Sequence, residues 1–282
     1  MTVGEALLYG YTTLAGNTPS SRLDAELLLS YVTSKERLAL ISHPEILLSE
    51  KEKGDFKDAI SRRAQNEPIG YIIGRKEFWG FDLLVNKNVL IPRPETEVLV
   101  EQALKLIDTL SGSVSILDLG TGSGAIAIAL ASELRDRHRD FTLIAVDKSE
   151  ESLKVAYENL RRFGLQQQVS LKQSDWFSAI STGEKFDLIV ANPPYIAAGD
   201  SRVSKELAFE PRQALFAGHD GLTEIKRIIE SAADYLTSRG QLMVEFGIGQ
   251  EAALVELLRD HEFNYHFVND YSSSPRVFVA YR

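Results

Sequence analysis

The stretch LDLGTGSGAIAIAL at residues 117–130 decides the fold of this chain. It predicts a buried strand, a tight glycine turn and then a helix. Gly120, Gly122 and Gly124 allow a close approach to the backbone, which a Cβ atom would block. The spacing resembles a dinucleotide-binding turn but departs from the G-x-G-x-x-G pattern. Such a turn, taken alone, is also compatible with a purely structural role in packing the helix on the strand.

Strands and helices alternate from residue 114 onward. Two strands without a helix between them, FNYHFVND at 263–270 and PRVFVAYR at 275–282, predict an antiparallel hairpin at one edge of the sheet. The pattern predicts a doubly wound α/β domain whose sheet is mostly parallel, with the last strand antiparallel. The other predicted strands are 114–120, 142–149, 169–175, 186–192 and 240–247, and the predicted helices are 124–136, 150–163, 221–238 and 249–261.

The first 75 residues have helical periodicity. LDAELLLSYV at 23–32 carries apolar residues at helical spacing, and a second helix at 51–65 follows Ser49, a predicted cap. We therefore predict a small all-α domain over residues 1–75. Such a domain is compatible with two roles, either stabilising the rest of the chain or holding a macromolecular substrate.

A change of composition marks the end of the helical region. In KEFWGFDLLVNKNVLIP at 76–92, aromatic and branched residues bracket Asn86-Lys87-Asn88. This arrangement predicts a β-hairpin linker that turns at these three residues. A helix is predicted from about Glu95, because acidic residues favour the first turn of a helix. Residues 93–282 then form the predicted α/β domain.

Side chains suited to ligand binding follow the next two strands. Asp147 ends one strand, where a carboxylate can accept hydrogen bonds from ribose hydroxyls, although it is also compatible with capping the next helix. Asp175 and Trp176 end the following strand, where an acid and an aromatic ring can meet the amino group and face of an adenine. Trp176 is equally compatible with a place in the core. These strand ends converge with the glycine turn at one edge of the sheet.

The run FDLIVANPPYI at 186–196 predicts a buried strand that opens into a rigid loop. Pro193 and Pro194 lack backbone N–H donors, and each pushes the residue before it out of the helical region. Asn192 is therefore held extended, with its amide available to accept hydrogen bonds from an NH₂ group on a planar substrate. Tyr195 offers a flat face for stacking. A turn without chemical function is the alternative for this segment alone.

Composition limits the class of protein. The chain has 282 residues, 44% of them hydrophobic and 25% charged, which is typical of a globular protein. It has no cysteine, which excludes disulfides and thiolate metal sites, and we expect no metal ion. No apolar run suits a membrane span and no signal peptide is recognisable, so we expect a cytoplasmic protein. The net charge of −9 argues against direct binding of nucleic acid.

Together these motifs resemble an S-adenosylmethionine-dependent methyltransferase with a Rossmann-like fold, of the branch that acts on planar amide or amino nitrogens. The segments VLIPRPETE at 89–97 and FEPRQALFAGHDGL at 209–222, with the helical N-terminal domain, narrow this resemblance. They are similar to the peptide chain release factor N5-glutamine methyltransferases, over nearly the whole chain. The resemblance implies methylation of the glutamine in the Gly-Gly-Gln motif of release factors. It places Arg93, Glu95 and Thr96 near the site without assigning roles to them.

The resemblance also implies roles for individual positions. Asp147 would bind the ribose of S-adenosyl-L-methionine, and the N-P-P-Y loop would hold the glutamine; the product would be S-adenosyl-L-homocysteine. Lys148 departs from the apolar residue that relatives often have beside the ribose acid, and we expect binding to survive this change. The implied cofactor-binding residues are Gly120, Thr121, Gly122, Ser123, Gly124, Asp147, Asp175, Trp176 and Asn192, and the implied catalytic residues are Asn192, Pro193, Pro194 and Tyr195.

An amide nitrogen is a poor nucleophile, because its lone pair is delocalised into the carbonyl group. We hypothesise that the Asn192 side-chain oxygen and the Pro193 carbonyl accept both N–H bonds of the substrate amide, while Tyr195 stacks on its plane. This would align the nitrogen with the methyl group and favour the charge that develops on it. No general base is required, since the methylated, N-protonated amide is a strong acid.

Three other functions remain open on the sequence. The first is a DNA or RNA adenine-N6 methyltransferase, because an exocyclic amino group is as poor a nucleophile as an amide nitrogen. The acidic net charge of the chain argues against this function. An NAD-dependent oxidoreductase would share the doubly wound sheet and leave the N-P-P-Y loop unexplained. A non-catalytic interaction protein would be expected to have lost motif residues. We expect release factors as protein substrates, recognised through residues 1–75, and a monomer that binds neither nucleic acid nor membrane.

Overall fold

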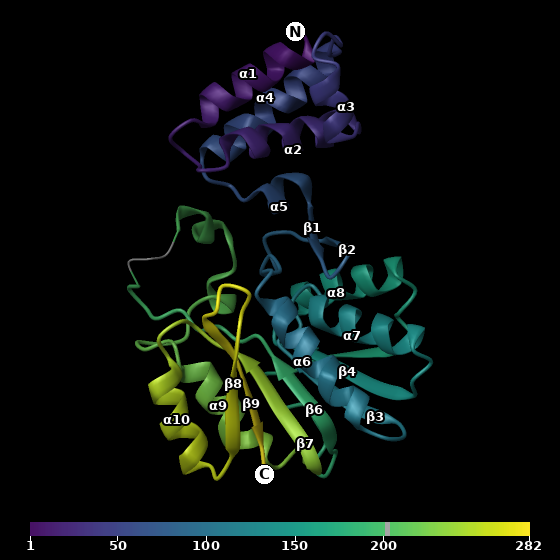
Figure 1. The fold of residues 1–282 in the computed structure, drawn as a ribbon, viewed down its shortest axis with the longest axis vertical. Helices are drawn as coiled ribbons and strands as arrows, with labels where there is room; N and C mark the ends of the chain where they lie inside the picture. The colour runs from purple at the N-terminus through teal and green to yellow at the C-terminus, as the bar shows by residue number, and fades with distance from the viewer. Residues whose placement is uncertain (201–203) are drawn as a thin grey trace. The chain divides into compact units, whose positions relative to one another are not determined.

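The computed structural model describes residues 1–200 and 204–282. They form two compact units, each with its own hydrophobic core (Figure 1). The first unit comprises Met1–Arg75 and Ser204–Phe209, and the second comprises Lys76–Val203 and Glu210–Arg282. Among the described residues, no helix combines the length and the apolar character that a membrane crossing requires.

The first unit is all-α. Leu28, Leu29 and Phe56 are fully buried at its centre. Ser49 caps α4 as predicted, because its side chain accepts a hydrogen bond from the Glu52 amide while the Glu52 carboxylate accepts one from the Ser49 amide. The helices of this unit are α1 (Val3–Leu14), α2 (Ser21–Thr33), α3 (Arg37–Ser42), α4 (Glu50–Ala64) and α5 (Ile69–Ile73), with the short 3₁₀ helix η1 (Lys205–Phe209).

A buried guanidinium joins η1 to the helices of the same unit. Arg63 is 5% exposed and pairs with Asp24 at 2.7 Å and with Glu206 of η1 at 2.6 Å. Its Nη2 also donates to the Thr18 hydroxyl at 3.1 Å. Because breaking a buried ion pair leaves an uncompensated charge, this cluster holds the 204–209 segment on the helical unit.

The hairpin after the helical unit turns earlier than predicted. It consists of β1 (Arg75–Phe78) and β2 (Phe81–Leu84), and it turns at Trp79 and Gly80, whose φ angles are 53° and 77°. Two consecutive positive φ values fit the type I′ turn that matches the twist of paired strands. The predicted turn at Asn86–Asn88 was therefore wrong as a hairpin turn. It is a separate turn beyond β2, in which Asn86 Oδ1 accepts from the Asn88 amide.

The second unit contains a seven-stranded sheet in the order β5-β4-β3-β6-β7-β9-β8 within the described residues. The neighbouring strands β5, β4, β3, β6 and β7 run parallel to one another. Strand β9 runs antiparallel to both of its neighbours, β7 and β8. This confirms the predicted fold class, with the terminal hairpin at one edge. The strands are β3 (Val114–Leu119), β4 (Phe141–Asp147), β5 (Val169–Gln173), β6 (Phe186–Ala191), β7 (Leu236–Glu245), β8 (Asn264–Asn269) and β9 (Pro275–Tyr281).

The sheet is covered on both faces because its central strands are mostly apolar. In β3, Ile116 and Leu117 belong to different core clusters, as expected for neighbouring residues that point to opposite faces. Helices α6 (Thr96–Thr109), α7 (Ala125–Asp136) and α8 (Glu150–Arg162) contribute to one cluster. Helices α9 (Thr223–Ala232) and α10 (Glu251–Asp260) contribute to the other. The carboxyl ends of the parallel strands thus meet at one edge, where the loops gather (Figure 1).

Strand β7 begins before the predicted residue 240, and α9 ends before the predicted residue 238. The pairing shifts register, since Phe186 lies opposite Leu236 whereas Leu188 lies opposite Gln241. The extra residues of β7 form an irregularity next to Gly240, where a Cβ atom would lie 2.6 Å from the Phe186 carbonyl oxygen. A strand broken in this way does not show a simple alternation in sequence.

Candidate functional site

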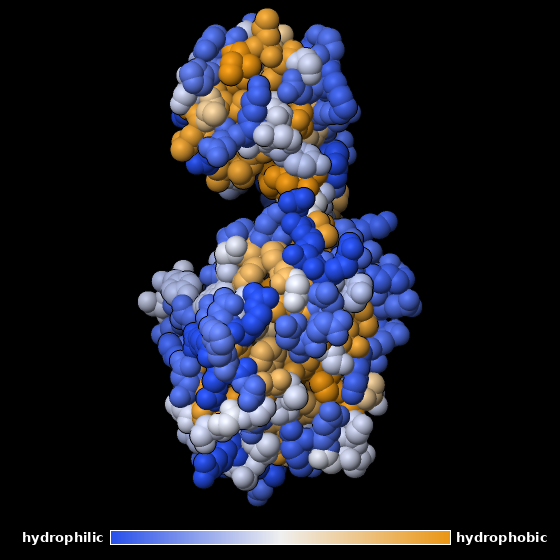
Figure 2. Space-filling model, turned by 90° about the vertical axis from the view of Figure 1, so that its right-hand side faces the viewer, coloured by the Kyte–Doolittle hydropathy of each residue, from blue (hydrophilic) through white to orange (hydrophobic). Residues whose placement is uncertain are grey.

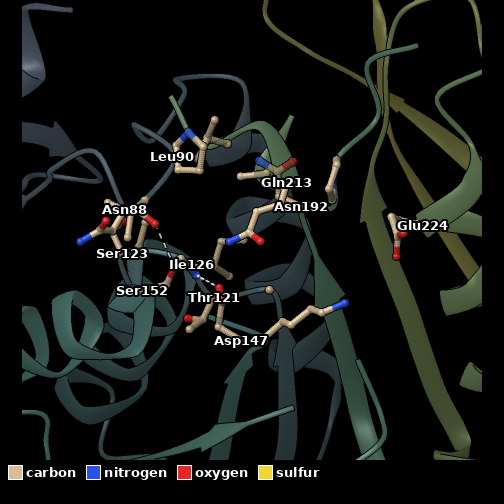
Figure 3. Close-up of a pocket in the computed structure, with 18 of the residues that line it drawn as sticks. Asn88, Leu90, Thr121, Ser123, Ile126, Asp147, Ser152, Asn192, Gln213 and Glu224 are labelled. Carbon is tan, nitrogen blue, oxygen red and sulfur yellow. Dashed lines mark hydrogen bonds between the residues drawn. The ribbon is translucent and has the colours of Figure 1, made fainter. Parts of the chain in front are cut away.

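A cavity of about 290 Å³ lies in the second unit, where the carboxyl ends of the parallel strands meet (Figure 3). It brings together residues from the glycine turn, the ends of β4 and β6, and the segment after β5. Gly124, Pro193 and Tyr195, which the sequence also predicts as site residues, do not line it. The predicted residues that do are Gly120, Thr121, Gly122, Ser123, Asp147, Asp175, Trp176, Asn192 and Pro194, together with Thr96 from the PRPETE segment.

The glycine turn closes over an aromatic ring. Gly120 has a φ of 73°, and a Cβ atom on it would lie 3.2 Å from Cζ3 of Trp176. The turn is fixed to the sheet because the amides of Gly120 and Thr121 both donate to the Val146 carbonyl at 2.9 Å. Glycine is therefore required at residue 120 by both its left-handed conformation and the approach of the ring.

Asp147 connects the end of β4 to the glycine turn. Its Oδ2 accepts from the Gly122 amide at 2.9 Å, and its Oδ1 accepts from the Ser149 amide at 2.8 Å. Burial raises the pKa of Asp147, while the backbone hydrogen bonds oppose this shift. Ser149, not Asp147, caps α8 by accepting from the Ser152 amide. Each carboxylate oxygen retains a lone pair for a ligand hydroxyl in the cavity.

Asp175 and Trp176 form the wall beyond β5. Asp175 lies 3.2 Å from both Lys148 Nζ and Arg227 Nη2, and these cations, Arg227 first, hold its pKa below the usual range. Lys148 therefore forms an ion pair with Asp175. Trp176 adopts a φ of 51° and donates its indole N–H to Glu224 at 2.6 Å. Its ring both packs on the core and lines the cavity, so the two alternatives for Trp176 are compatible.

Asp118 lies beneath the glycine turn and was not predicted as a site residue. It is fully buried, and its Oδ2 accepts from the Thr121 hydroxyl at 2.6 Å. Burial raises the pKa of Asp118 to about 7. The sequence did contain a signal for Asp118, because an acidic residue lies between two leucines at the end of a buried strand. Burying such a group without a role is costly.

Asn192 follows β6 and lines the cavity, as Figure 3 shows. Its Nδ2 donates to Thr96 Oγ1 at 3.0 Å. Its Oδ1 is buried and has no hydrogen-bond partner among the described residues. Because buried amide oxygens are normally paired, this acceptor is available to a donor from a bound ligand. Pro193 and Pro194 are buried and hold the loop in place.

Tyr195 is anchored toward the interior of the unit. Its hydroxyl donates to Glu245 Oε1 at 3.0 Å, and its carbonyl accepts from Gln250 Nε2 at 3.0 Å. Burial and the neighbouring Glu245 raise the pKa of the Tyr195 hydroxyl. Stacking of Tyr195 on a substrate amide stays a prediction. Glu245 itself, fully buried at the end of β7, was not predicted from the sequence.

The two flanking segments of the motif set meet at the cavity. Glu210 of the FEPRQ segment is 4% exposed and accepts from the Ile91 amide at 3.0 Å and from the Arg93 guanidinium. Leu90 and Gln213 come from these same segments and line the cavity (Figure 3). The pairing of Arg93 with Glu210 assigns one of the roles that the sequence left undetermined.

Models of protein families match both units. The model of the PrmC N-terminal domain matches residues 5–74, and the model of a methyltransferase domain matches residues 110–276. Curated proteins match nearly the whole chain. The release factor glutamine methyltransferase of Shewanella oneidensis is 41% identical over 97% of this chain and 94% of that protein. That of Pseudomonas aeruginosa is 43% identical over 93% and 92%.

Solved structures share the fold at low identity. The catalytic domain of hMettl16, in complex with MAT2A 3′UTR hairpin 1, has a TM-score of 0.58, with 17% identity over 90% of both chains. A methyltransferase from Pyrococcus furiosus has a TM-score of 0.51, with 18% identity over 78% of this chain and 97% of that one. At such identities the likeness concerns the fold alone.

Proposed function

The chain belongs to the family of release factor glutamine methyltransferases, and from this we propose that it methylates peptide chain release factors. The acceptor is the side-chain amide nitrogen, N5, of the glutamine in their Gly-Gly-Gln motif. S-adenosyl-L-methionine is the methyl donor, and S-adenosyl-L-homocysteine is the product.

The residues of the cavity fit the donor. Gly120 and Gly122 have left-handed conformations that leave the backbone open to a ligand, and Asp147 offers lone pairs suited to ribose hydroxyls. Trp176 adds an aromatic wall, and Asp175 an acceptor for an amino group. When bound, S-adenosylmethionine supplies a methyl group that is already electrophilic because it is attached to a sulfonium. The chain's own task is to bind and align the amide nitrogen.

The unpartnered Asn192 Oδ1 is the observation that carries the proposal. A glutamine amide has two N–H donors, and Asn192 Oδ1 with the Pro193 carbonyl would accept both of them. This would aim the nitrogen at the methyl group and favour the positive charge that develops as its lone pair leaves conjugation. Alignment of this kind lowers barriers by roughly 7–11 kcal/mol in well-oriented systems.

The helical unit would provide specificity for the release factor, since one loop of a protein substrate offers little surface for recognition. Large apolar side chains on this unit are exposed, and Figure 2 shows apolar areas on its surface. Leu8, Leu38 and Leu47 are 63%, 69% and 74% exposed. Where exposed apolar side chains gather into one patch, the patch is typical of a protein-binding surface. We further propose a cytoplasmic monomer that does not bind nucleic acid directly, in keeping with the net charge of −9.

Mass spectrometry of purified release factor tests the function directly. Incubation with the protein and S-adenosylmethionine should add one methyl group to the peptide that contains Gly-Gly-Gln, on its glutamine. An unmodified peptide, or labelled methyl transferred to DNA or RNA in its place, would refute the proposal and favour the adenine-N6 alternative.

A further inference from the structure

A chain of hydrogen bonds links the buried carboxylate of Glu245 to the Asn192 amide. Thr96 Oγ1 lies 2.6 Å from Glu245 Oε2, and Asn192 Nδ2 lies 3.0 Å from the same Oγ1. The second carboxylate oxygen, Oε1, accepts from the Tyr195 hydroxyl at 3.0 Å. Glu245 is fully buried and Thr96 is 4% exposed, so the chain lies within the interior of the second unit.

The protons available to these groups set the direction of each hydrogen bond. Burial raises the pKa of Glu245, while the hydrogen bonds from Thr96 and Tyr195 oppose this shift by favouring the ionised form. In that form the carboxylate only accepts, whereas a threonine hydroxyl has one proton to donate and lone pairs to accept with. The Thr96 proton is directed to Glu245, at the short distance typical of a charge-assisted bond. Thr96 Oγ1 must therefore act as an acceptor toward Asn192.

This polarity determines which end of the Asn192 amide is left without a hydrogen-bond partner. With its NH₂ group held by Thr96, the amide presents Oδ1 on the other side, where it has no partner among the described residues. We propose that Glu245, acting through Thr96, is a positioning residue that keeps the Asn192 oxygen turned toward the substrate amide. This inference rests on the proposed function, because the occupant of Asn192 Oδ1 is the glutamine amide.

Glu245→Gln tests the polarity with almost no change of shape. The new amide can keep its oxygen toward Tyr195 and place its NH₂ toward Thr96, which would then donate to Asn192. The Asn192 amide would turn and present NH₂ to the NH₂ of the substrate. We expect the kcat of methyl transfer to fall on the order of 100-fold, as for loss of a transition-state hydrogen bond. Affinity for S-adenosylmethionine, measured by calorimetry, should stay within a few-fold and shows that the variant is folded.

A second substitution should restore an acceptor. In the double variant Asn192→Asp with Glu245→Gln, the aspartate can accept from Thr96 on one side and from the substrate on the other. We expect its kcat to exceed that of Asn192→Asp alone by about tenfold or more. If the two substitutions caused independent defects, their free-energy costs would add and the double variant would have a lower kcat than either single variant. Thr96→Ser, which keeps the hydroxyl, should lose far less activity than Thr96→Val, which removes it.

The outcomes separate the inference from the function on which it rests. A wild-type kcat in Glu245→Gln, or a double variant as impaired as the two single losses combined, would overturn the inference alone. A wild-type protein that leaves release factor unmethylated would overturn the proposed function, and the inference with it.

Discussion

The backbone amide of Gly122 donates to the carboxylate of Asp147 across 2.9 Å, which joins the turn after β3 to the end of β4. The two residues are 25 positions apart in the chain and line the same cavity. The turn that we propose approaches the methyl donor and the acid that we propose binds its ribose are therefore joined by a hydrogen bond. Substitutions at either residue should therefore lower the affinity for S-adenosylmethionine.

Asp147→Asn should weaken the binding of S-adenosylmethionine by about 10- to 100-fold, since a hydrogen bond to a charged group contributes roughly 1.5–3 kcal/mol. Isothermal titration calorimetry measures this directly. Asp260→Asn is the matched control, because Asp260 is exposed at the end of α10 and away from the cavity lining. Equal affinity in the Asp147 variant and the wild type would remove Asp147 from the site.

Gly120→Ala should lower both the stability of the protein and its affinity for the donor. The added Cβ would lie 3.2 Å from the Trp176 ring, and the residue would keep a φ of 73°. Gly183→Ala provides the control, because its φ is also positive, at 92°, while its Cβ would meet nothing within 4 Å. We expect both variants to lose stability in thermal unfolding, but only Gly120→Ala to bind S-adenosylmethionine less tightly. Equal donor affinity in the two would contradict a role for the Trp176 contact.

Asp118 should make the stability of the protein depend on pH. The pKa of Asp118 is about 7 in the folded protein, against an ordinary aspartate pKa of 3.8. Between these values the folded state holds a proton that the unfolded state has lost, so stability should fall as pH rises toward 7. The contribution of this group is up to about 1.4 kcal/mol per pH unit.

Asp118→Asn removes this titration. Compared with the wild type in urea unfolding at pH 5 and pH 8, the variant should gain relative stability at the higher pH. Parallel stability curves for the two proteins would show that Asp118 does not titrate in this range.

Recognition by the helical unit can be tested on its exposed leucines. A triple variant, Leu8→Ser, Leu38→Ser and Leu47→Ser, should raise the KM for release factor several-fold while leaving the affinity for S-adenosylmethionine unchanged. The control is Tyr157→Ser, at a residue 50% exposed on α8 of the second unit. An unchanged KM in the triple variant would argue against this surface as the docking site.

The sequence predicted the sheet and its strand ends well, because these features are local. The apolar runs of β3 and β6 and the glycines after β3 identify themselves by composition and spacing. Parallel topology then places their carboxyl ends at one edge without further information. Asp147 and Asn192, at two of these ends, accordingly line one cavity.

The features that the sequence did not predict depend on contacts between distant segments. Thr96 and Glu245 are separated by 149 residues, and nothing in the sequence near either one indicates their hydrogen bond. The hairpin turn was misplaced for a local reason, since Asn86 and Asn88 are stronger turn formers than Trp79. The conformation of Trp79 is enforced by strand pairing, which no single residue reveals.

The central claim is that Asn192 Oδ1 accepts the substrate amide. Methyl transfer to release factor should be compared for wild type and Asn192→Ala, at saturating S-adenosylmethionine and with donor affinity measured separately. The account predicts a kcat lower by about 100-fold or more in Asn192→Ala, with a much smaller change in donor affinity. Wild-type turnover in Asn192→Ala would contradict it.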